Sequence, residues 1–452
     1  MGRPSHAREL GLWMNGAFVG TWSIQSHYVD QLAYDSEWMA SAQGRPLSLS
    51  LPFTPDNAPH RGPAVCYYFE NLLPDSKPIR ERIAGRFGVG STDAFDLLSE
   101  IGRDCVGALQ ILPKGVAPAE MTPIQATPLD EAAIARLLRA TTTPTPLGRH
   151  EEPDEFRISI AGAQEKTALL RCQDNWCLPY GATPSTHIFK LPLGLVGGLQ
   201  FDMRDSVENE WLCSRILDAY GLPVAECEPL QFEDVKVLAV RRFDRSWWKV
   251  PARGDQQLIR LPQEDMCQVK GISPEAKYEA DGGPGVDDIM GILNGSTNRE
   301  ADRRTFFQAQ VIFWMLCATD GHAKNFSIFL RPGGRYALTP LYDVLSAYPV
   351  MGKGAHQLSP LKARMAMAVR ARNAHWKQRE ILRRHWIELG ARHGVVGPDG
   401  QPAQFVVDEL AARTPHVIDM VRAQLPDGFP AHVAESILEG LHEAANQLAG
   451  QE

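Results

Sequence analysis

The hydrophobic periodicity of the chain changes near residue 286, and this change constrains the fold more than any other feature. Before it, short strand-like runs over 167–171, 187–191 and 237–243 surround one helical segment over 205–220. After it, apolar residues recur every three or four positions over 301–317, 374–393, 402–425 and 430–449, which is the spacing of amphipathic helices. The sequence therefore predicts an α+β fold in which a β-rich lobe (150–255) precedes a mainly helical lobe (256–452).

A separate unit precedes these lobes. Two apolar runs flank Asn15 and Gly16, a pair that favours the tight turn of a β-hairpin. Strands expected over 47–53 and 108–112, and helices expected over 77–86 and 94–101, extend this N-terminal α/β subdomain to residue 113. Proline and threonine are frequent from 114 to 149, where only 129–140 has helical spacing. We therefore expect a linker there that contains one short helix.

Composition narrows the classes of protein to consider. The 452 residues are 44% hydrophobic, enough to bury a large core. No apolar run reaches about eighteen residues, so neither a transmembrane helix nor a secretory signal is expected. The eight cysteines include no Cys-x-x-Cys pair, in keeping with thiols in a reducing compartment. These features predict a cytoplasmic protein.

The charge of the chain is unevenly distributed. Its net charge of −8 argues against a nucleic-acid partner held by bulk electrostatics. Residues 362–393, however, hold nine Lys or Arg against two Glu, a local net charge of 9 − 2 = +7. A solvated helix face is the usual meaning of such a run. The alternative is auxiliary DNA contact through Arg372, Lys377 and Arg379, because tryptophans interleave with the charges.

The strongest chemical motif is Asp320–Asn325, which directly follows an apolar helical segment. In phosphoryl transfer, the Asp of a D-x-x-x-x-N loop accepts the proton of the nucleophile and the Asn binds Mg²⁺. Lys324, within the motif, is placed to neutralise the phosphoryl group in transit. The alternative is a polar turn that Asp and Asn side chains stabilise.

A second carboxylate follows the motif at the distance of one hairpin. Strand-like runs over 326–330 and 336–339 flank Gly333 and lead to Tyr342 and Asp343. Asp343 lies 343 − 325 = 18 residues after Asn325, where a kinase delivers its second metal-binding aspartate, although no Asp-Phe-Gly sequence is present. The two side chains could complete an oxygen-ligand set for Mg²⁺ together with phosphates and water.

The opposite side of a nucleotide site is predicted in the β-rich lobe. Lys190 lies on an apolar strand and can reach phosphate oxygens if an acidic residue holds it, for which Glu210 is the candidate. The loop 158–167 contains small residues that let backbone amides approach an anion. That loop has one glycine and is neither a Walker A motif nor Gly-x-Gly-x-x-Gly. Ser159 lies beside the proposed triphosphate site.

Several motifs together resemble the HipA family, the kinase toxins of HipBA toxin–antitoxin systems. In the second half of the chain these are SIAGAQEKT (159–167), LPQED (261–265), DGGPG (281–285) and ATDGHAKN (318–325). In the first half they are LSLSLP (47–52), ENLLPD (70–75) and DLLSEIGR (96–103). The resemblance spans nearly the whole chain. It implies a serine/threonine-protein kinase with a protein-kinase-like bilobal fold and an extra N-terminal subdomain.

The resemblance also implies residue roles. Asp320 would be the catalytic base, Asn325 and Asp343 the metal ligands, and Lys190 the phosphate clamp supported by Glu210. ATP would contact Ala161, Gly162, Ala163, Gln164, Glu165, Lys166, Lys190, Arg241, Phe243, His322, Lys324, Asn325, Tyr342 and Asp343. Ser159 would be an autophosphorylation site that switches the kinase off. The chain departs from the family at Arg241, a hinge position where an acidic residue is expected.

The partners expected from the resemblance are a HipB-like helix-turn-helix antitoxin and, through it, operator DNA with nucleoid association. The expected substrate is glutamyl-tRNA synthetase, whose phosphorylation would stall translation and promote persistence. Two other functions fit the same residues less completely. One is a kinase of similar fold that phosphorylates a small molecule, and the other is a non-catalytic corepressor whose nucleotide site tunes partner affinity.

Overall fold

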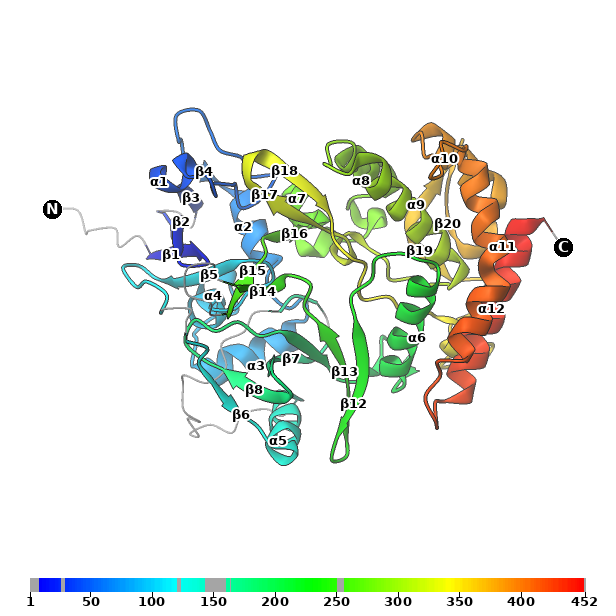
Figure 1. Cartoon of the computed structure of the whole chain (residues 1–452), viewed down its shortest axis with the longest axis horizontal. Helices are drawn as coiled ribbons and strands as arrows, with labels where there is room; N and C mark the ends of the chain where they lie inside the picture. Colours follow the sequence, from blue (N-terminus) through cyan, green and yellow to red (C-terminus); the bar gives the residue numbers. More distant parts are fainter. Residues whose placement is uncertain are drawn as a thin grey trace.

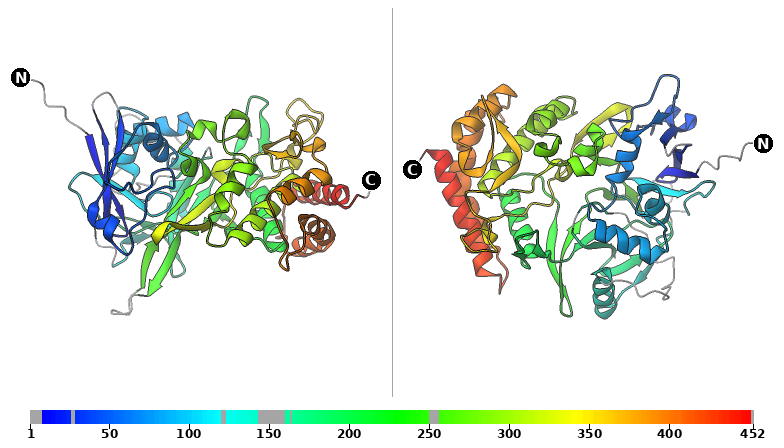
Figure 2. Two further views of the ribbon diagram at one scale, coloured as in Figure 1. Left: turned by 90° about the horizontal axis from the view of Figure 1, so that it is seen from above. Right: turned by 180° about the vertical axis from the view of Figure 1, so that it is seen from behind.

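A computed structural model describes residues 8–25, 29–119, 123–142, 160–162, 164–249 and 256–450. The chain forms three packed parts: an N-terminal unit (8–113), a β lobe (123–260) and a helical lobe (261–450). The N-terminal unit and the last two helices lie at opposite ends of the longest axis, and the β lobe lies between them (Figure 1). The same order is seen from above and from behind (Figure 2). No helix among the described residues is both long and apolar enough to span a membrane.

The N-terminal unit is built on a five-stranded antiparallel sheet. Its strand order is β4-β3-β2-β1-β5, formed by β1 (Arg8–Met14), β2 (Ala17–Ile24), β3 (Asp30–Tyr34), β4 (His60–Arg61) and β5 (Leu109–Pro113). The predicted hairpin is confirmed, because Asn15 and Gly16 have φ of 47° and 84° at the β1–β2 turn, as a type I′ turn requires. The helices α1 (Ser36–Ala40), α2 (Pro63–Glu70), α3 (Lys77–Phe87) and α4 (Ala94–Ile101) complete the unit.

The strand predicted over 47–53 is wrong, since this segment is a loop. Its polar groups bind the helical lobe instead of a neighbouring strand. The hydroxyls of Ser48 and Ser50 donate to the carbonyl of Gln268 at 3.0 and 2.7 Å, and the Leu49 N–H donates to the Glu264 side-chain Oε1 at 2.8 Å. The loop is therefore a docking segment between two parts of the molecule.

The β lobe contains a six-stranded sheet of order β12-β13-β9-β7-β8-β6. Its strands are β6 (Ala126–Pro128), β7 (Lys166–Cys172), β8 (Asn175–Pro179), β9 (His187–Lys190), β12 (Cys227–Phe232) and β13 (Val235–Arg241). The helix α5 (Glu131–Thr142) packs Ile134 and Leu138 against Leu169 and Phe189 of this sheet. Part of the predicted linker therefore belongs to the lobe. The helix α6 (Ser206–Ala219) and the hairpins β10 (Gly194–Val196)–β11 (Phe201–Met203) and β14 (Arg245–Lys249)–β15 (Gln256–Arg260) complete it.

The helical lobe surrounds a large apolar core. Its helices are α7 (Met266–Lys270), α8 (Val286–Leu293), α9 (Arg299–Met315), α10 (Arg383–Arg392), α11 (Ala403–Arg422) and α12 (Ala431–Ala449). A three-stranded sheet of β16 (Gln263–Asp265), β17 (Ser327–Arg331) and β18 (Arg335–Leu338) lies next to α7. The second half of α9, from Phe306 to Met315, is almost entirely buried, so the loop at 316–325 that follows it has a rigid support.

The helix predicted over 374–393 is wrong in its first part. Residues Ala374–Lys377 form β20, which pairs with β19 (Arg364–Arg370), and the helix α10 begins at Arg383. The indole of Trp376 lies 5.8 Å from the guanidinium groups of both Arg364 and Arg370. Cross-strand contacts of this kind override local periodicity, because strand formation depends on neighbouring strands.

A buried ion network joins the N-terminal unit to the β lobe. The carboxylate of Asp104 lies 3.2, 2.8 and 3.2 Å from the guanidinium nitrogens of Arg242, Arg245 and Arg260. Asp244 lies 2.9 Å from Arg242 and 3.1 Å from Arg245. All five side chains are buried. Their mutual pairing satisfies charges that would otherwise be costly inside the molecule.

Candidate active site

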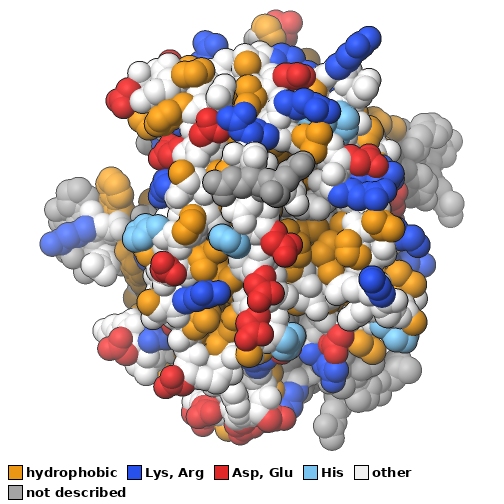
Figure 3. All heavy atoms as spheres, turned by 90° about the vertical axis from the view of Figure 1, so that its right-hand side faces the viewer, with side chains coloured by type: hydrophobic (Ala, Val, Ile, Leu, Met, Phe, Trp, Pro, Cys, Tyr) orange, Lys and Arg blue, Asp and Glu red, His pale blue; other side chains and the backbone are white. Residues whose placement is uncertain are grey.

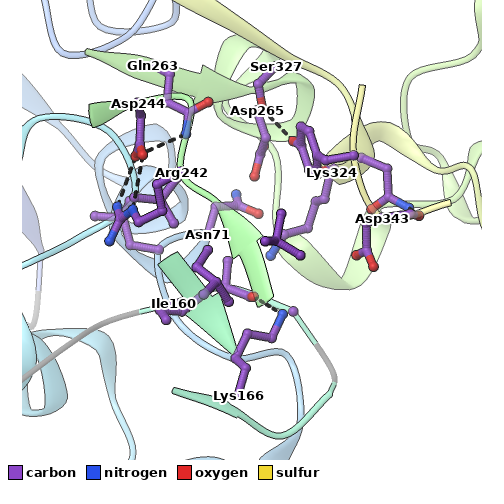
Figure 4. Close-up of a pocket in the computed structure, with 18 of the residues that line it drawn as sticks. Asn71, Ile160, Lys166, Arg242, Asp244, Gln263, Asp265, Lys324, Ser327 and Asp343 are labelled. Carbon is purple, nitrogen blue, oxygen red and sulfur yellow. Dashed lines mark hydrogen bonds and ion pairs between the residues drawn. The ribbon is translucent and has the colours of Figure 1, made fainter. Parts of the chain in front are cut away.

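A cavity opens where the three parts meet, and residues from all of them line it. Figure 4 shows Lys324 and Asp343 on one side and Lys166 and Ile160 on another. In the same view, Arg242, Asp244 and Gln263 lie together away from Asp343. Of the residues predicted from the sequence, the following line the cavity: Ala161, Gly162, Lys166, Lys190, Arg241, Phe243, Asp320, His322, Lys324, Asn325, Tyr342 and Asp343.

Lys190 is held between two carboxylates. From strand β9, its Nζ donates at 2.6 Å to Glu210 on α6 and at 2.6 Å to Asp343. Burial alone would lower the pKa of Lys190, but Asp343 and Glu210 outweigh it and keep that pKa above its usual range. Burial would likewise raise the pKa of Asp343, but the charges of Lys190 and Lys166 hold it below its usual range. Both groups are therefore charged at neutral pH.

Asp343 adopts an unusual backbone conformation. Its φ of 61° lies in the left-handed region, which costs a non-glycine residue about 1–3 kcal/mol and is concentrated at functional sites. The side-chain nitrogen of Asn325 donates to the carbonyls of Asp320 and Asp343 at 2.9 and 3.3 Å. The amide of Asn325 is therefore oriented by the two segments it joins, with its nitrogen engaged and its oxygen turned away from those carbonyls.

Asp320 lies after α9 at the exposed mouth of the cavity, where 63% of its side-chain surface is accessible. The hydroxyl of Tyr278 donates a short hydrogen bond to its Oδ1. The Tyr278 ring meets the His322 imidazole edge to face with centroids 5.0 Å apart. Burial lowers the pKa of His322, so the imidazole is neutral at pH 7. Asp320 is consequently an accessible carboxylate held by a tyrosine.

The loop that precedes β7, together with the first residue of that strand, forms the wall facing Asp343. Lys166 donates to the carbonyl of Ala161 at 2.7 Å. Burial and the neighbouring charge of Lys190 lower the pKa of Lys166 to about 8. Gly162 has φ of 110°, and a Cβ there would lie 2.5 Å from the Lys166 Nζ. The positive φ favours glycine at this position, and a larger residue would also displace the Lys166 ammonium group.

Some predicted nucleotide-loop residues do not reach the cavity. Gln164 donates to the carbonyl of Leu191 at 2.5 Å, and Glu165 forms an ion pair with Arg82 on α3. Neither side chain lines the cavity, because each is engaged on the side that faces α3 and α5. Ser159 and Ala163 lie outside the described residues.

One part of the same cavity is lined by apolar side chains. Its walls include Val106, Ile188 and Val240, together with the rings of Phe243 and Tyr342, whose centroids are 5.6 Å apart. This shape and polarity suit a flat heteroaromatic group. The side chain of Arg241 is mostly exposed and pairs with Glu226 at 2.9 Å, so the unexpected cation at the hinge is neutralised by a neighbour.

Sequence reasoning missed the contribution of the N-terminal unit. Asn71, Leu72, Asp75 and Val106 line the cavity, as do Gln263, Asp265 and Lys277 from the helical-lobe segments. The ENLLPD motif at 70–75 is the signal that could have indicated three of these positions. Burial raises the pKa of Asp265 to about 6, which makes this carboxyl less acidic than Asp343 at the same cavity.

The basic region is divided between folded elements. Arg372 and Arg379 are exposed, whereas Lys377 pairs with Glu380 at 2.9 Å. Trp386 is fully buried in the core of the helical lobe, so it does not interleave with charges at the surface. The face of the molecule seen in Figure 3 mixes acidic, basic and apolar side chains without one large patch of a single sign.

The protein has a β lobe with a Lys–Glu pair and a helical lobe with an Asp–Asn loop, and a cavity lies between the two lobes. These features define it as a bilobal protein kinase. The comparisons with known proteins agree. Residues 10–112 match the family model described as the HipA N-terminal domain, and residues 158–418 match that of the HipA-like C-terminal domain. The chain therefore belongs to the HipA family of serine/threonine-protein kinase toxins, as its motifs predicted.

Individual relatives support this assignment. The chain is 36% identical over 349 residues to the protein Y4mE of Sinorhizobium fredii, covering 76% of this chain and 78% of that protein. It is 29% identical over 327 residues to the serine/threonine-protein kinase toxin HipA of Shewanella oneidensis, covering 69% of each. Its fold is similar to HipA in a Shewanella oneidensis complex of HipA, HipB and operator DNA. The TM-score is 0.76 at 23% identity, over 98% of this chain and 97% of that one.

Proposed function

We propose that this kinase transfers the γ-phosphoryl group of ATP to a serine or threonine of a protein and acts as the toxin of a HipBA-type system. The observation that carries the proposal is the convergence of Lys190, Asp343, Asn325 and Asp320 on one cavity, with Glu210 holding Lys190 from behind. The same five residue types in this arrangement serve phosphoryl transfer in protein kinases. A chain without catalytic activity would have no need to keep the whole set.

The donor set of the cavity is suited to Mg²⁺. Asp343 supplies an ionised carboxylate and Asn325 an oriented amide oxygen, the hard ligands that Mg²⁺ prefers. Among the described residues no group of three or more His, Cys, Asp or Glu side chains could hold a metal. This pair therefore suits an ion that takes its other ligands from phosphates and water. When bound, the ion would neutralise charge on the transferring phosphoryl group.

Each side chain then has a distinct task. Lys190 binds phosphate oxygens while Glu210 keeps it aligned, and Lys166 lies beside the same compartment from the opposite wall. The acceptor hydroxyl approaches the exposed mouth, where the Asp320 carboxylate accepts its proton. This position of Asp320 favours a large acceptor that docks from outside over a small molecule enclosed in the cavity.

The acceptor, the partners and the off-switch are proposed from the family. We infer that the acceptor is a translation component, with glutamyl-tRNA synthetase as the first candidate, and that its phosphorylation stops growth and favours persistence. A HipB-like antitoxin would bind the kinase and bring it to operator DNA, an arrangement supported by the similarity to HipA in the Shewanella oneidensis complex with HipB and operator DNA. Arg372, Lys377 and Arg379 are the candidate DNA contacts.

The central test is phosphotransfer from [γ-³²P]ATP with Mg²⁺, to glutamyl-tRNA synthetase and to a cell lysate, followed by phosphosite mapping. We expect Asp320→Asn to lose transfer by at least about 100-fold, as removal of a positioned base does, while ATP binding persists. Transfer at the wild-type rate by Asp320→Asn would exclude this residue as the base. Labelling of small molecules alone would replace the protein acceptor with a metabolite.

Autophosphorylation is tested separately at Ser159. A phosphate there would add about −1.5 to −2 charges next to the phosphates of ATP, and repulsion would expel the loop or the nucleotide. We expect Ser159→Ala to abolish the added mass of the self-phosphorylated protein in intact-mass spectra. A major phosphorylated product at another residue would contradict the assignment.

A further inference from the structure

The segment Pro74–Asp75 of the N-terminal unit contacts both walls of the cavity. The Asp75 N–H donates to the carbonyl of Gly162 at 3.1 Å, and Pro74 pairs with Gly162 as a parallel β-bridge. The guanidinium of Arg80 donates to the Pro74 carbonyl at 2.6 Å. The backbone of this segment is therefore fixed from α3 and supports the glycine loop of the β lobe.

The side chain of Asp75 points to the opposite wall. Its two oxygens lie 2.6 Å from the Nζ of Lys324 and 2.8 Å from the Nζ of Lys277. Burial would raise the pKa of Asp75, but Lys324 and Lys277 outweigh it and lower that pKa to about 2. Asp75 is thus ionised throughout the physiological range, and one carboxylate anchors two lysines.

Both lysines are adjacent to residues that hold the catalytic base. Lys324 precedes Asn325, whose side chain donates to the carbonyl of Asp320. Lys277 precedes Tyr278, whose hydroxyl donates to the Asp320 carboxylate. The ion pairs of Asp75 therefore restrain the two segments that orient Asp320, while its backbone restrains the loop across the cavity.

We propose that Asp75 is a positioning residue for phosphoryl transfer, and that the N-terminal unit is the third wall of the active site. This inference rests on the proposed kinase function and adds a requirement to it. Asp75 sets the distance between the glycine loop and the Asp320–Asn325 loop. Asp75 acts through its ion pairs with Lys324 and Lys277. Without the N-terminal unit, the β lobe and the helical lobe would lose this link between the two loops.

The discriminating variant is Asp75→Asn, which keeps the shape and the backbone contact with Gly162 but removes the charge. Lys324, only 4% accessible at its side chain, then lacks a full counter-charge, and the loop that contains it shifts. A displacement of about 1 Å at a catalytic loop can cost about 100-fold in rate. We expect kcat to fall about 10–100-fold while KM for ATP changes less than about threefold.

The measurement is initial-rate transfer from [γ-³²P]ATP at varied ATP concentration, with glutamyl-tRNA synthetase as the acceptor and self-phosphorylation as a second readout. Asp75→Glu retains the charge, and we expect it to recover part of the lost kcat. The matched control is Glu81→Gln, which removes an exposed carboxylate of the same unit that lies 3.8 Å from Lys77. We expect that variant to match the wild type in both constants.

A double variant tests whether Asp75 acts through Lys324. If it does, Asp75→Asn and Lys324→Met together should lower kcat by much less than the product of their separate effects. Independent, multiplying effects would overturn this route, and unchanged kcat in Asp75→Asn would overturn the proposal. If Asp75→Asn does not fold, Lys277→Met replaces it. A several-fold loss of kcat in that variant supports the proposal and wild-type kcat overturns it. Absence of transfer by the wild type in both readouts would instead refute the proposed kinase function.

Discussion

Replacement of Asp104 by asparagine should weaken the attachment of the N-terminal unit to the β lobe. In the wild type, Asp104 and Asp244 face three arginines, a buried net charge of 3 − 2 = +1. Asp104→Asn raises this to 3 − 1 = +2 without changing the size of the side chain. Removal of one partner from a buried ion pair costs about 3–5 kcal/mol. We expect the free energy of unfolding to fall by that amount.

The pH dependence adds a second criterion. Burial would raise the pKa of Asp104, but Arg245, Arg242 and Arg260 outweigh it and hold the pKa below its usual range. A carboxyl with a lowered folded pKa contributes stability above its unfolded pKa of about 4 and loses it only in strong acid. The difference between the wild type and Asp104→Asn should therefore be constant from pH 5 to pH 9.

Urea unfolding, followed by tryptophan fluorescence and by circular dichroism, measures the loss of unfolding free energy and its dependence on pH. Arg242 and Asp244 also line the cavity, so ATP affinity measured by calorimetry should fall in the same variant. Asp202→Asn is the control, because Asp202 pairs with Arg204 at the exposed surface and should leave the unfolding midpoint unchanged. A loss of less than about 1 kcal/mol in Asp104→Asn, or a loss that varies across this pH range, would refute the reasoning.

Three further predictions concern other sites. Burial raises the pKa of Glu264 to about 8, so the folded state retains a proton that the unfolded state loses near pH 4.3. Its stabilising effect should be complete below that pH and decline as pH rises toward 8. Glu264→Gln should abolish this decline in urea midpoints measured at pH 5, 6.5 and 8, and an unchanged slope would contradict the assignment. Lys190→Met leaves the buried carboxylate of Glu210 and the partly exposed carboxylate of Asp343 without their cation. The affinity for ATP in the presence of Mg²⁺ should drop at least about tenfold in calorimetry, since the phosphate clamp is lost; wild-type affinity would remove Lys190 from the site. Reversal of the exposed charges Arg372 and Arg379 to glutamate should reduce the salt dependence of operator binding by the antitoxin complex. An identical salt slope would exclude these residues as phosphate contacts.

Local patterns predicted the elements whose structure depends on neighbours in sequence. The Asn15–Gly16 turn forms as expected because its backbone preference is intrinsic to the two residues. Helix α9 and the loop that follows it also lie where the apolar spacing and the D-x-x-x-x-N motif placed them. Lys190 and Glu210 could be paired in advance because motif order suggested the partner, and their Nζ and Oε1 atoms meet at 2.6 Å.

Contacts between distant parts of the chain could not be predicted in this way. Asp75 and Lys324 are 249 residues apart, and no periodicity connects them. The alternation in 47–53 suggested a strand, yet Ser48 and Ser50 bind a carbonyl of the helical lobe. The apolar spacing at 374–377 likewise suggested a helix, although pairing with its partner β19 makes this segment a strand.

Buried ion pairs join the three parts of the molecule. The N-terminal unit contributes the anions Asp75 and Asp104, while the β lobe and the helical lobe contribute the lysines and arginines that bind them. A buried cation that loses its carboxylate is far more costly than a lost surface pair. Separation of the N-terminal unit would therefore leave cations uncompensated at the hinge beside Arg242 and at the catalytic loop beside Lys324. The geometry of the active site depends on the attachment of a domain that carries none of its predicted catalytic residues.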